Sequence, residues 1–224
     1  MCGIFGICHS DKRSVINEQQ LKQSAGIIQH RDPDVHGVYA GAGVGFAHTR
    51  LSLLDREARS AQPFWDQTGR YCLVYNGEVY NYQALRKDLE KKGYRFITSS
   101  DTEVILYSLI HSGIDALATF EGMFAFSFYD KETVSVILER DRFGIKPLYI
   151  YTDSDLILFS SEIKAFKPWV SLEPDKFSIS SYLMGYGGPN ASFTLYNKVK
   201  IMPTGTWVKI ESGKKYNTIK THRF

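Results

Sequence analysis

The spacing of hydrophobic and polar residues divides this chain into strand-like and helix-like segments. Alternation with a two-residue period runs from Cys2 to Cys8 and predicts a buried strand. After Asn17, Asn81 and Asp101, apolar residues instead recur every three or four positions, which predicts three helices. Asparagine is a favoured N-cap residue, so Asn17 and Asn81 are expected to begin the first two of these helices.

Beyond residue 122 the pattern changes to short apolar runs divided by turn residues, which is typical of β-structure. The predicted strands after the first are residues 41–49, 71–75, 123–129, 135–138, 148–152, 156–159 and 207–210, and two further short helices are predicted at 162–166 and 175–184. Because the helices fall in pairs between groups of strands, this order predicts a layered α+β fold rather than a regular alternation of strand and helix.

Composition narrows the classes of protein to which the chain can belong. Its 224 residues, 43% of them hydrophobic, suffice for one large domain or two small ones with a real core. A net charge of +3, without a basic run interleaved with aromatic residues, argues against a nucleic-acid partner. No apolar run is long enough to cross a bilayer, so no membrane association is expected.

The cysteines favour a reducing compartment, and we expect the protein to be cytoplasmic. There are three of them, Cys2, Cys8 and Cys72, an odd number without the Cys-x-x-Cys spacing of zinc sites. A disulfide framework and a zinc-binding protein are therefore both disfavoured, and no metal site is expected. Cys8 is expected to serve only as packing.

Cys2 has an unusual chemical option because only Met1 precedes it. Removal of Met1 would leave Cys2 with an α-amine beside its own thiol. A model α-amine titrates at about 7.7–8.0 and a thiol near about 8.5, so one group can take a proton from the other near neutrality. A nucleophile with an adjacent base is the minimum apparatus for covalent catalysis. By position alone, however, Cys2 is more simply an apolar residue of the first strand.

Three polar motifs lie at expected strand ends or helix starts, and each also has a simple structural interpretation. Arg50 follows a strand and by itself suggests a structural ion pair. Asn76 and Gly77 follow another strand and by themselves suggest a hairpin turn. Asp101 precedes apolar helical positions and by itself is most simply an N-cap.

Taken together with Cys2, these residues fit one ligand, a free amino acid. The planar fork of Arg50 suits the carboxylate of the ligand, and Asp101 suits its ammonium group. The side-chain amide of Asn76 and the backbone N–H of Gly77 can aim at one oxygen, which is the composition of an oxyanion hole. With Cys2 as nucleophile, the ligand is an amino acid whose side chain holds the carbonyl to be attacked, such as glutamine.

Seven sequence blocks then show a resemblance that spans nearly the whole chain. They are Cys2-Gly-Ile-Phe-Gly, His48-Thr-Arg-Leu-Ser, Asn76-Gly-Glu-Val-Tyr-Asn, Ser100-Asp-Thr-Glu-Val-Ile, Gly122-Met-Phe-Ala-Phe, Arg140-Asp-Arg-Phe-Gly-Ile-Lys-Pro-Leu-Tyr and Ser160-Ser-Glu-Ile-Lys-Ala. In these blocks the chain resembles the glutaminase half of class II glutamine amidotransferases, which are N-terminal nucleophile hydrolases, and among them the asparagine synthetase type. One block would be a weak signal, whereas seven in the family's order are very specific.

The resemblance implies a fold, a reaction and the residues that carry it. The implied fold is α+β, a four-layer αββα sandwich of two antiparallel sheets between two helical layers. The implied reaction is hydrolysis of L-glutamine to glutamate and ammonia, with the ammonia meant for an ATP-dependent synthetase partner. Cys2 matches the nucleophile and its α-amine the general base, while Asn76 and Gly77 match the oxyanion hole.

The remaining matches concern the hold on the substrate. Arg50 matches the residue that grips the glutamine carboxylate, with the backbone of Leu53 and Leu54 beside it. Glu78 matches a residue that lies along the bound glutamine, and Asp101 matches the partner of its ammonium group.

The chain departs from the family pattern at two points. Asp32 stands where the family usually has the glycine of Arg-Gly-Pro-Asp, and although aspartate tolerates left-handed conformations better than most residues, we expect a strained or shifted loop. The Ser-Gly-Gly-x-Asp-Ser phosphate loop of the synthetase domain does not occur here. We therefore expect residues 1–210 to form the glutaminase domain and residues 211–224 to form a tail leading towards an absent synthetase domain. No cofactor is expected in this chain, since ATP and Mg would belong to that domain.

Several alternatives stay open at this stage. The ammonia acceptor is either aspartate or a carboxyl group on a sugar or peptide precursor, the chain is either a fragment or a stand-alone domain, and a homodimer is compatible with the sequence. A second functional hypothesis is a catalytically degenerate domain that binds an amino acid or a partner domain without turnover. The intact set of Cys2, Arg50, Asn76 and Asp101 argues against this hypothesis.

Overall fold

Two antiparallel β-sheets packed face to face form the framework of the molecule. The computed structural model describes residues 2–31, 35–50, 58–185, 193–213 and 220–224. The first sheet contains β1 (Gly3–His9), β2 (Val35–Ala40), β3 (Val44–Arg50), β8 (Tyr149–Thr152), β9 (Leu156–Ser160) and β10 (Val199–Ile201). The second sheet contains β4 (Phe64–Trp65), β5 (Tyr71–Val79), β6 (Gly122–Asp130), β7 (Ser135–Arg140), β11 (Thr206–Glu211) and β12 (His222–Arg223).

The strand order places one site-bearing strand in each sheet. The first sheet runs β10-β8-β9-β1-β3-β2, so β1 is an inner strand with antiparallel neighbours on both sides. The second sheet runs β12-β11-β7-β6-β5-β4, in which β5 pairs with β6 over its whole length but with β4 over only two residues. Among the described residues, most of the far edge of β5 therefore has no paired strand.

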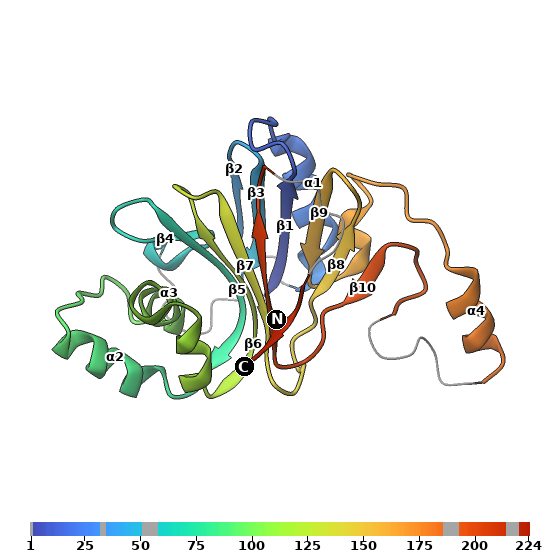
Figure 1. Cartoon of the computed structure of the whole chain (residues 1–224). Helices are drawn as coiled ribbons and strands as arrows, with labels where there is room; N and C mark the ends of the chain where they lie inside the picture. Colours follow the sequence, from blue (N-terminus) through green and yellow to red (C-terminus); the bar gives the residue numbers. More distant parts are fainter. Residues whose placement is uncertain (1, 32–34, 51–57, 186–192, 214–219) are drawn as a thin grey trace.

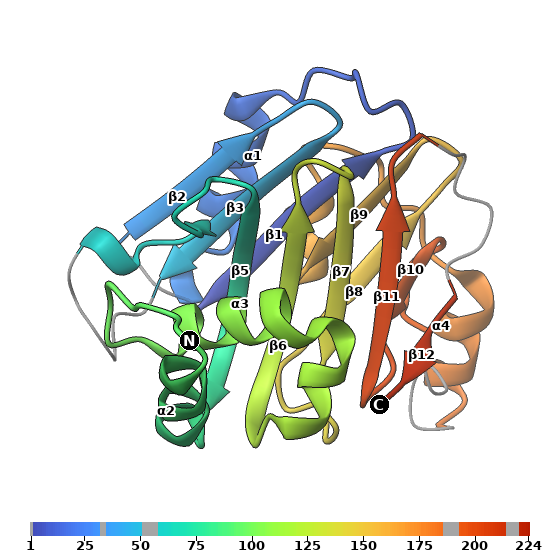
Figure 2. The ribbon, with the colours of Figure 1, turned by 60° about the vertical axis from the view of Figure 1, so that its left-hand side comes forward.

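Helices cover the outer faces of the two sheets. The helical segments are α1 (Glu18–Ile27), α2 (Tyr82–Lys91), α3 (Asp101–Ser112) and α4 (Lys176–Leu183), together with the 3₁₀ turns η1 (Gln29–Arg31), η2 (Ala58–Ser60), η3 (Gly113–Thr119) and η4 (Ile163–Phe166). α1 packs on β1, β2 and β3 of the first sheet, whereas α3 packs on β5 of the second and α2 packs on α3. Figures 1 and 2 show this layering, with α3 and η3 crossing the face of the second sheet. The expected α+β sandwich with four αββα layers is confirmed.

Three buried clusters correspond to the three interfaces between these layers. The central cluster, between the sheets, includes Ile4, Phe46, Val74 and Phe159. The outer clusters lie under α1 on one side and under α3 and η3 on the other. The predicted alternation in the first strand is confirmed, because Ile4 and Cys8 belong to the central cluster while Phe5 and Ile7 face α1.

The predicted elements differ from the observed ones mainly in length and in small pieces. Strand 71–75 does not stop at Asn76: β5 continues to Val79, because residues 76–79 keep pairing with β6 in register. The pieces that periodicity missed are β2, which has six residues, and the two- or three-residue strands β4, β10 and β12. Segments of two or three residues are too short to show a period, and they exist because a neighbouring strand pairs with them.

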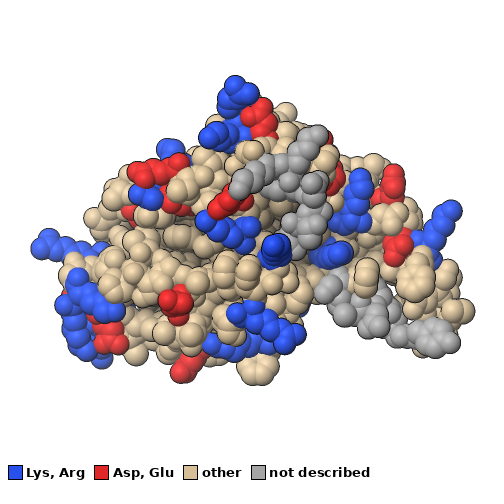
Figure 3. Space-filling view, in the orientation of Figure 1, with Lys and Arg blue, Asp and Glu red and all other residues tan. Residues whose placement is uncertain are grey.

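Surface features give two further facts. α4 stands away from both sheets (Figure 1), and several apolar side chains on it or directly after it are exposed, Phe177 to 82%, Leu183 to 76% and Met184 to 68%. On the face seen in Figure 3, basic and acidic side chains are interspersed, in keeping with the small net charge.

Candidate functional site

Cys2 lies directly before the inner strand β1 and is partly exposed. The residue that follows it, Gly3, has a packing reason to be glycine. A Cβ at this position would lie 2.6 Å from Thr49 Oγ1, 2.9 Å from Ile28 Cδ1 and 3.2 Å from Arg31 Cδ. The side chains of Thr49, Ile28 and Arg31 therefore close around the backbone next to Cys2 and leave no room for a Cβ at position 3.

A hydrogen bond between the sheets ties the strand beside β1 to the strand that carries Asn76. His48 on β3 is fully buried, and its Nε2 lies 3.1 Å from the carbonyl oxygen of Tyr75 on β5. Because a carbonyl oxygen only accepts hydrogen bonds, Nε2 must carry the proton. This contact sets the distance between the sheet that holds Cys2 and the strand that holds Asn76 and Gly77.

The side-chain amide of Asn76 is a hydrogen-bond donor without an acceptor in the described part of the chain. Its side chain is 1% exposed, and its Nδ2 has no hydrogen-bond partner among the described residues. A buried donor without a partner costs free energy, so such groups usually serve a ligand or a reaction. The sequence predicted this side chain as an oxyanion donor, and its state fits that role.

The backbone N–H of Gly77 points to the open edge of β5. In an antiparallel strand, alternate N–H groups point to opposite sides. The N–H of Tyr75 donates to Gln62 Oε1 at 2.6 Å and that of Val79 donates to Asp101 Oδ2 at 3.1 Å, both away from β6. The N–H of Gly77, midway between them, shares their direction. Glycine is needed here because a Cβ would lie 2.3 Å from the carbonyl oxygen of Met123 on β6.

A buried acidic group lies next to this edge. Asp101, at the start of α3, is 5% exposed and its Oδ2 accepts hydrogen bonds from the hydroxyl of Tyr75 at 2.7 Å and from the Val79 N–H. Burial raises the pKa of Asp101, and the nearby charge of Glu78 adds to this, although the hydrogen bonds oppose it. Ser100, rather than Asp101, occupies the N-cap position of α3. The side chain of Asp101 therefore faces the β5 edge instead of capping its helix.

The electrostatics of Tyr75 show that the candidate residues lie close together. Burial first, and then the negative charges of Asp101, Cys2 and Glu78, raise the pKa of Tyr75 well above its usual value. These influences indicate that Cys2, which precedes β1, Glu78 on β5 and Asp101 at the start of α3 lie near the same phenol.

Part of the predicted site lies outside the residues that the structure describes. Arg50 is the last residue of β3, at the exit of a strand as predicted. Leu53, Leu54 and Asp32 lie outside the described residues. The predicted hold on a substrate carboxylate therefore remains a prediction.

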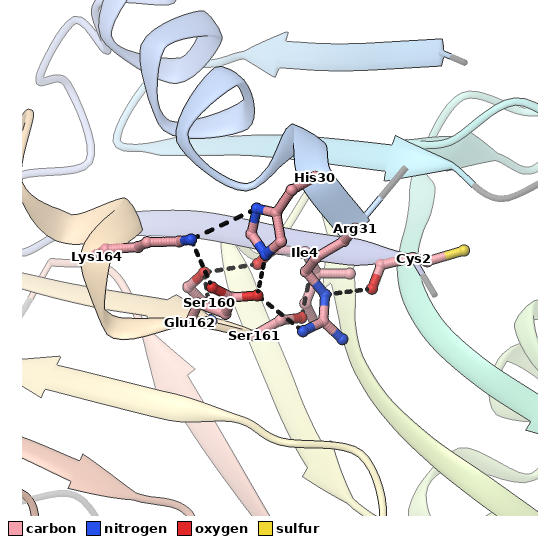
Figure 4. A network of polar contacts seen from close by, with 8 residues as sticks. All are labelled: Cys2, Ile4, His30, Arg31, Ser160, Ser161, Glu162 and Lys164. Carbon is pink, nitrogen blue, oxygen red and sulfur yellow. Dashed lines mark hydrogen bonds and ion pairs between the residues drawn. The ribbon is translucent and has the colours of Figure 1, made fainter. Parts of the chain in front are cut away.

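Arg31, a residue without a predicted role, contacts Cys2 and is itself paired with Glu162. Arg31 donates from Nε to the carbonyl oxygen of Cys2 at 3.0 Å and from Nη1 to Glu162 Oε1 at 3.0 Å. Figure 4 shows the carbonyl of Cys2 facing this network while its sulfur points away from it. The sulfur of Cys2 therefore does not face the ion pair between Arg31 and Glu162.

The described residues contain neither a metal-binding cluster nor a membrane-spanning helix. No group of three or more His, Cys, Asp or Glu residues there is arranged to hold a metal ion. In the same part of the chain, no helix has the length and apolar character needed to span a membrane.

A sandwich of two antiparallel sheets enclosed by helices, with a cysteine directly before an inner strand, is the fold expected from the resemblance to N-terminal nucleophile hydrolases. The comparison with solved structures agrees: glutamine phosphoribosylpyrophosphate amidotransferase from B. subtilis, complexed with ADP and GMP, superimposes with a TM-score of 0.71 at 22% identity, over 99% of this chain and 49% of that one. Residues 1–223 match the model of the glutamine amidotransferase domain. The chain belongs to the glutamine amidotransferase domain family.

Curated relatives narrow the similarity further. Asparagine synthetase [glutamine-hydrolyzing] 1 of Bacillus subtilis (strain 168) is 38% identical over 209 residues, which are 92% of this chain and 33% of the relative. Asparagine synthetase B [glutamine-hydrolyzing] of Escherichia coli (strain K12) is 38% identical over 194 residues, covering 86% of this chain and 34% of the relative. The chain thus spans about a third of the length of these relatives.

Proposed function

We propose that this domain hydrolyses the side-chain amide of L-glutamine to glutamate and ammonia, with the Cys2 thiol as nucleophile. The observation that carries the proposal is the buried amide of Asn76, whose Nδ2 lacks a partner among the described residues. Together with the outward N–H of Gly77 it offers two donors on one strand, beside the sheet that begins with Cys2. Two such donors suit an oxygen that gains negative charge during a reaction.

The proposed chemistry uses two successive attacks on one carbonyl carbon. Once Met1 is removed, the α-amine of Cys2 takes the thiol proton, and the sulfur attacks the side-chain carbonyl of glutamine. Asn76 and Gly77 stabilise the resulting oxyanion, which collapses as the proton passes to the leaving nitrogen and ammonia departs. The remaining γ-glutamyl thioester is then hydrolysed by water, which restores the thiol and releases glutamate.

The substrate is held by its α-groups. Asp101, with Glu78 close by, provides a negatively charged environment for the ammonium group. The charge of Glu78 contributes to the raised pKa of Asp101, which supports their proximity. Arg50, with the backbone of Leu53 and Leu54, would bind the carboxylate; this assignment is supported by the resemblance in sequence. Neither group changes charge in the reaction, so both serve binding rather than the chemical step.

The ammonia is proposed to serve an ATP-dependent synthetase, on the same chain or on a partner. Support comes from the glutamine-hydrolysing asparagine synthetases, of which this chain spans about a third, and they favour aspartate as the acceptor. ATP and Mg would then be bound by the synthetase and no cofactor by this domain. A reducing compartment such as the cytoplasm would keep Cys2 a thiol; no disulfide joins any of the three cysteines, all of which are described.

A cleavable N-terminal fusion tests the mechanism. The fusion keeps the thiol of Cys2 but turns its α-amine into an amide without a basic lone pair, so it should bind glutamine and release no ammonia. Protease cleavage that leaves Cys2 as the first residue should restore ammonia and glutamate release in the same sample. A Cys2→Ala variant treated identically should bind glutamine by calorimetry but stay inactive.

The alternatives give different results in the same assay. If the uncleaved fusion is as active as the cleaved protein, the α-amine is not the base. If the cleaved protein binds glutamine but releases no ammonia, the domain is a degenerate binding module and the proposed function is wrong.

A further inference from the structure

Glu162 lies two residues after the end of β9, and its carboxylate contacts three basic side chains. Glu162 Oε1 accepts from Arg31 Nη1 at 3.0 Å and from His30 Nε2 at 2.9 Å, and its Oε2 lies 3.1 Å from Lys164 Nζ. Lys164 Nζ also lies 3.4 Å from His30 Nδ1, which must accept because an ammonium group only donates. The proton of neutral His30 therefore sits on Nε2, where it is donated to Glu162.

This carboxylate is held in its charged form. Burial works against the charge, but hydrogen bonds from Arg31, Lys164 and His30 outweigh burial and lower the pKa of Glu162. Its side chain is only 23% exposed and that of Arg31 only 9%, so water screens this ion pair less than it screens a surface pair.

Arg31 passes this fixation on to Cys2. The guanidinium bridges Glu162 Oε1 and the carbonyl oxygen of Cys2 with two bonds of 3.0 Å, as Figure 4 shows. The stem of Arg31 lies over Gly3, where a Cβ would come within 3.2 Å of its Cδ. A planar guanidinium with one end fixed leaves little freedom for the carbonyl at its other end.

The residues next to Glu162 also hold Ile4, two residues after Cys2, through hydrogen bonds to its backbone. Ser161 N and Ser160 Oγ both donate to the carbonyl oxygen of Ile4, at 3.0 and 2.9 Å, and Ile4 N donates to Ser161 Oγ at 3.1 Å. Glu162 N in turn donates to Ser160 Oγ at 3.2 Å. One three-residue segment, 160–162, therefore fixes the start of β1 through backbone bonds and through Arg31.

A first residue needs such fixation, because chain termini fray unless they are tied down. The thiol and the α-amine of Cys2 share one Cα with the carbonyl that Arg31 holds, so the orientation of that carbonyl restricts both reactive groups.

We propose that Glu162 is a positioning residue for the N-terminal nucleophile: acting through Arg31, it fixes the carbonyl of Cys2 and with it the directions of the thiol and the α-amine. The inference rests on the function proposed above and names a residue to which that function gives no part. Glu162 also balances the positive charge of Arg31 beside the reacting groups.

Loss of the negative charge of Glu162 should change the titration of the Cys2 thiol and amine, which distinguishes the proposed role from a purely structural one. Around Cys2, the described part of the chain places Arg31 with its partners on one side and Tyr75 with Asp101 and Glu78 on the other. Removing the Glu162 charge leaves Arg31 less compensated, which favours the deprotonated forms of the Cys2 thiol and amine. The titration of both groups should therefore move to lower pH.

Glu162→Gln is the central variant, because glutamine keeps the size of the side chain and an acceptor oxygen but loses the charge. We expect kcat for glutamine hydrolysis to fall roughly ten- to hundredfold, the order of loss for a small displacement of a reacting group, with little change in KM. The rate of Cys2 alkylation by iodoacetamide, followed by intact mass, should show its pH midpoint lowered as above. Cys8 and Cys72 do not interfere, because both are buried and burial raises the pKa of each thiol.

Asp130→Asn is the matched control. Asp130 forms a bidentate ion pair with Arg70 at 3.0 and 2.9 Å, and its side chain is 14% exposed. It lies at the end of β6 opposite Tyr71, five residues along β5 from Asn76. This control should lose a comparable amount of thermal stability while leaving kcat and the alkylation midpoint unchanged.

A double variant keeps the proposal testable if Glu162→Gln alone does not fold. Arg31→Met with Glu162→Gln removes both members of the ion pair, so it should fold, and its kcat should be as low as that of Arg31→Met alone because Glu162 acts through Arg31. A double variant with wild-type kcat would overturn the proposal. So would a folded Glu162→Gln protein that loses only stability, as the control does. If the wild-type protein has no glutaminase activity, the proposed function fails, but the alkylation midpoint still tests the action of Glu162 on Cys2.

Discussion

Replacing Glu139 with methionine should stabilise the protein. Glu139 on β7 is fully buried, and neither of its carboxylate oxygens has a hydrogen-bond partner among the described residues. Its cross-strand neighbours are Phe126 and Trp207, so the carboxyl group lies between aromatic residues under the α3 layer. Burial, followed by the charge of Asp141, raises the pKa of Glu139 well above its usual range, although Arg142 acts in the opposite direction.

The expected gain follows from what methionine removes. A buried polar group without a partner costs about 1–3 kcal/mol, and methionine fills a similar space without such a group. In a domain of this size, each kcal/mol shifts the melting temperature by about 2–4 °C. We therefore expect Glu139→Met to raise the melting temperature at pH 8 by about 2–12 °C.

The gain should depend on pH in one direction. The unfolded chain loses its Glu139 proton near the ordinary value of about 4.3, whereas the folded protein keeps it to higher pH because the folded pKa is raised. Below the unfolded pKa the protonated group costs the fold least, and this stability is lost as the pH rises through the folded pKa. The advantage of methionine is therefore smallest near pH 4 and largest above the folded pKa.

Urea unfolding followed by tryptophan fluorescence, at several pH values between 4 and 9, measures this difference directly. Glu121→Met, at an exposed position, is the control and should give no pH-dependent gain. Glu139→Gln removes the charge but keeps a polar group, so it should abolish the pH dependence and recover only part of the stability. A Glu139→Met protein that is less stable than wild type at pH 8, or whose gain does not change with pH, would refute the reasoning.

Three further predictions concern the site. Asn76→Ala should lower kcat about 10²–10³-fold with KM almost unchanged, because an oxyanion donor acts only in the transition state; steady-state kinetics that gave a raised KM alone would contradict the assignment. Asp101→Asn should mainly raise KM, and in the wild-type protein KM should rise on acidification as Asp101, whose pKa burial raises, takes up a proton. A KM independent of both changes would remove Asp101 from the ammonium site. Gly77→Ala should lose several °C of melting temperature together with activity, since its Cβ meets the Met123 carbonyl at 2.3 Å; calorimetry showing wild-type stability would mean that β6 can shift.

Periodicity located the long elements because burial on one face leaves a repeating pattern. It failed at Asn76 and Gly77, which have the composition of a turn, because pairing with β6 keeps them in a strand. Local composition describes what a segment prefers, whereas nine consecutive pairings with a neighbouring strand impose extended backbone. The role of glycine at position 77 likewise depends on β6 and could not be read from the neighbouring residues.

The sequence could predict those residues of the candidate site whose side-chain type by itself suggests a chemical role. Cys2, Asn76 and Asp101 could be selected because a nucleophile, an amide donor and a carboxylate have specific uses. Arg31 and Glu162 could not, since their contact spans 131 positions of the chain and neither residue type is distinctive by itself. The available signals were weak: Arg31 precedes a proline-containing loop, and Glu162 lies in a motif without an obvious reactive group.

The bond between His48 and Tyr75 has a consequence for how this protein can vary. Because the proposed nucleophile precedes a strand of one sheet and the proposed oxyanion donors lie on the other, the central cluster between the sheets acts as a spacer that would set the reaction distance. Stacked sheets lie about 10 Å apart, and a change of one methylene in this layer is felt by its neighbours. Substitutions at residues such as Phe46 or Val74 should therefore change the rate of the reaction before they unfold the protein, so that turnover reports on the thickness of the core.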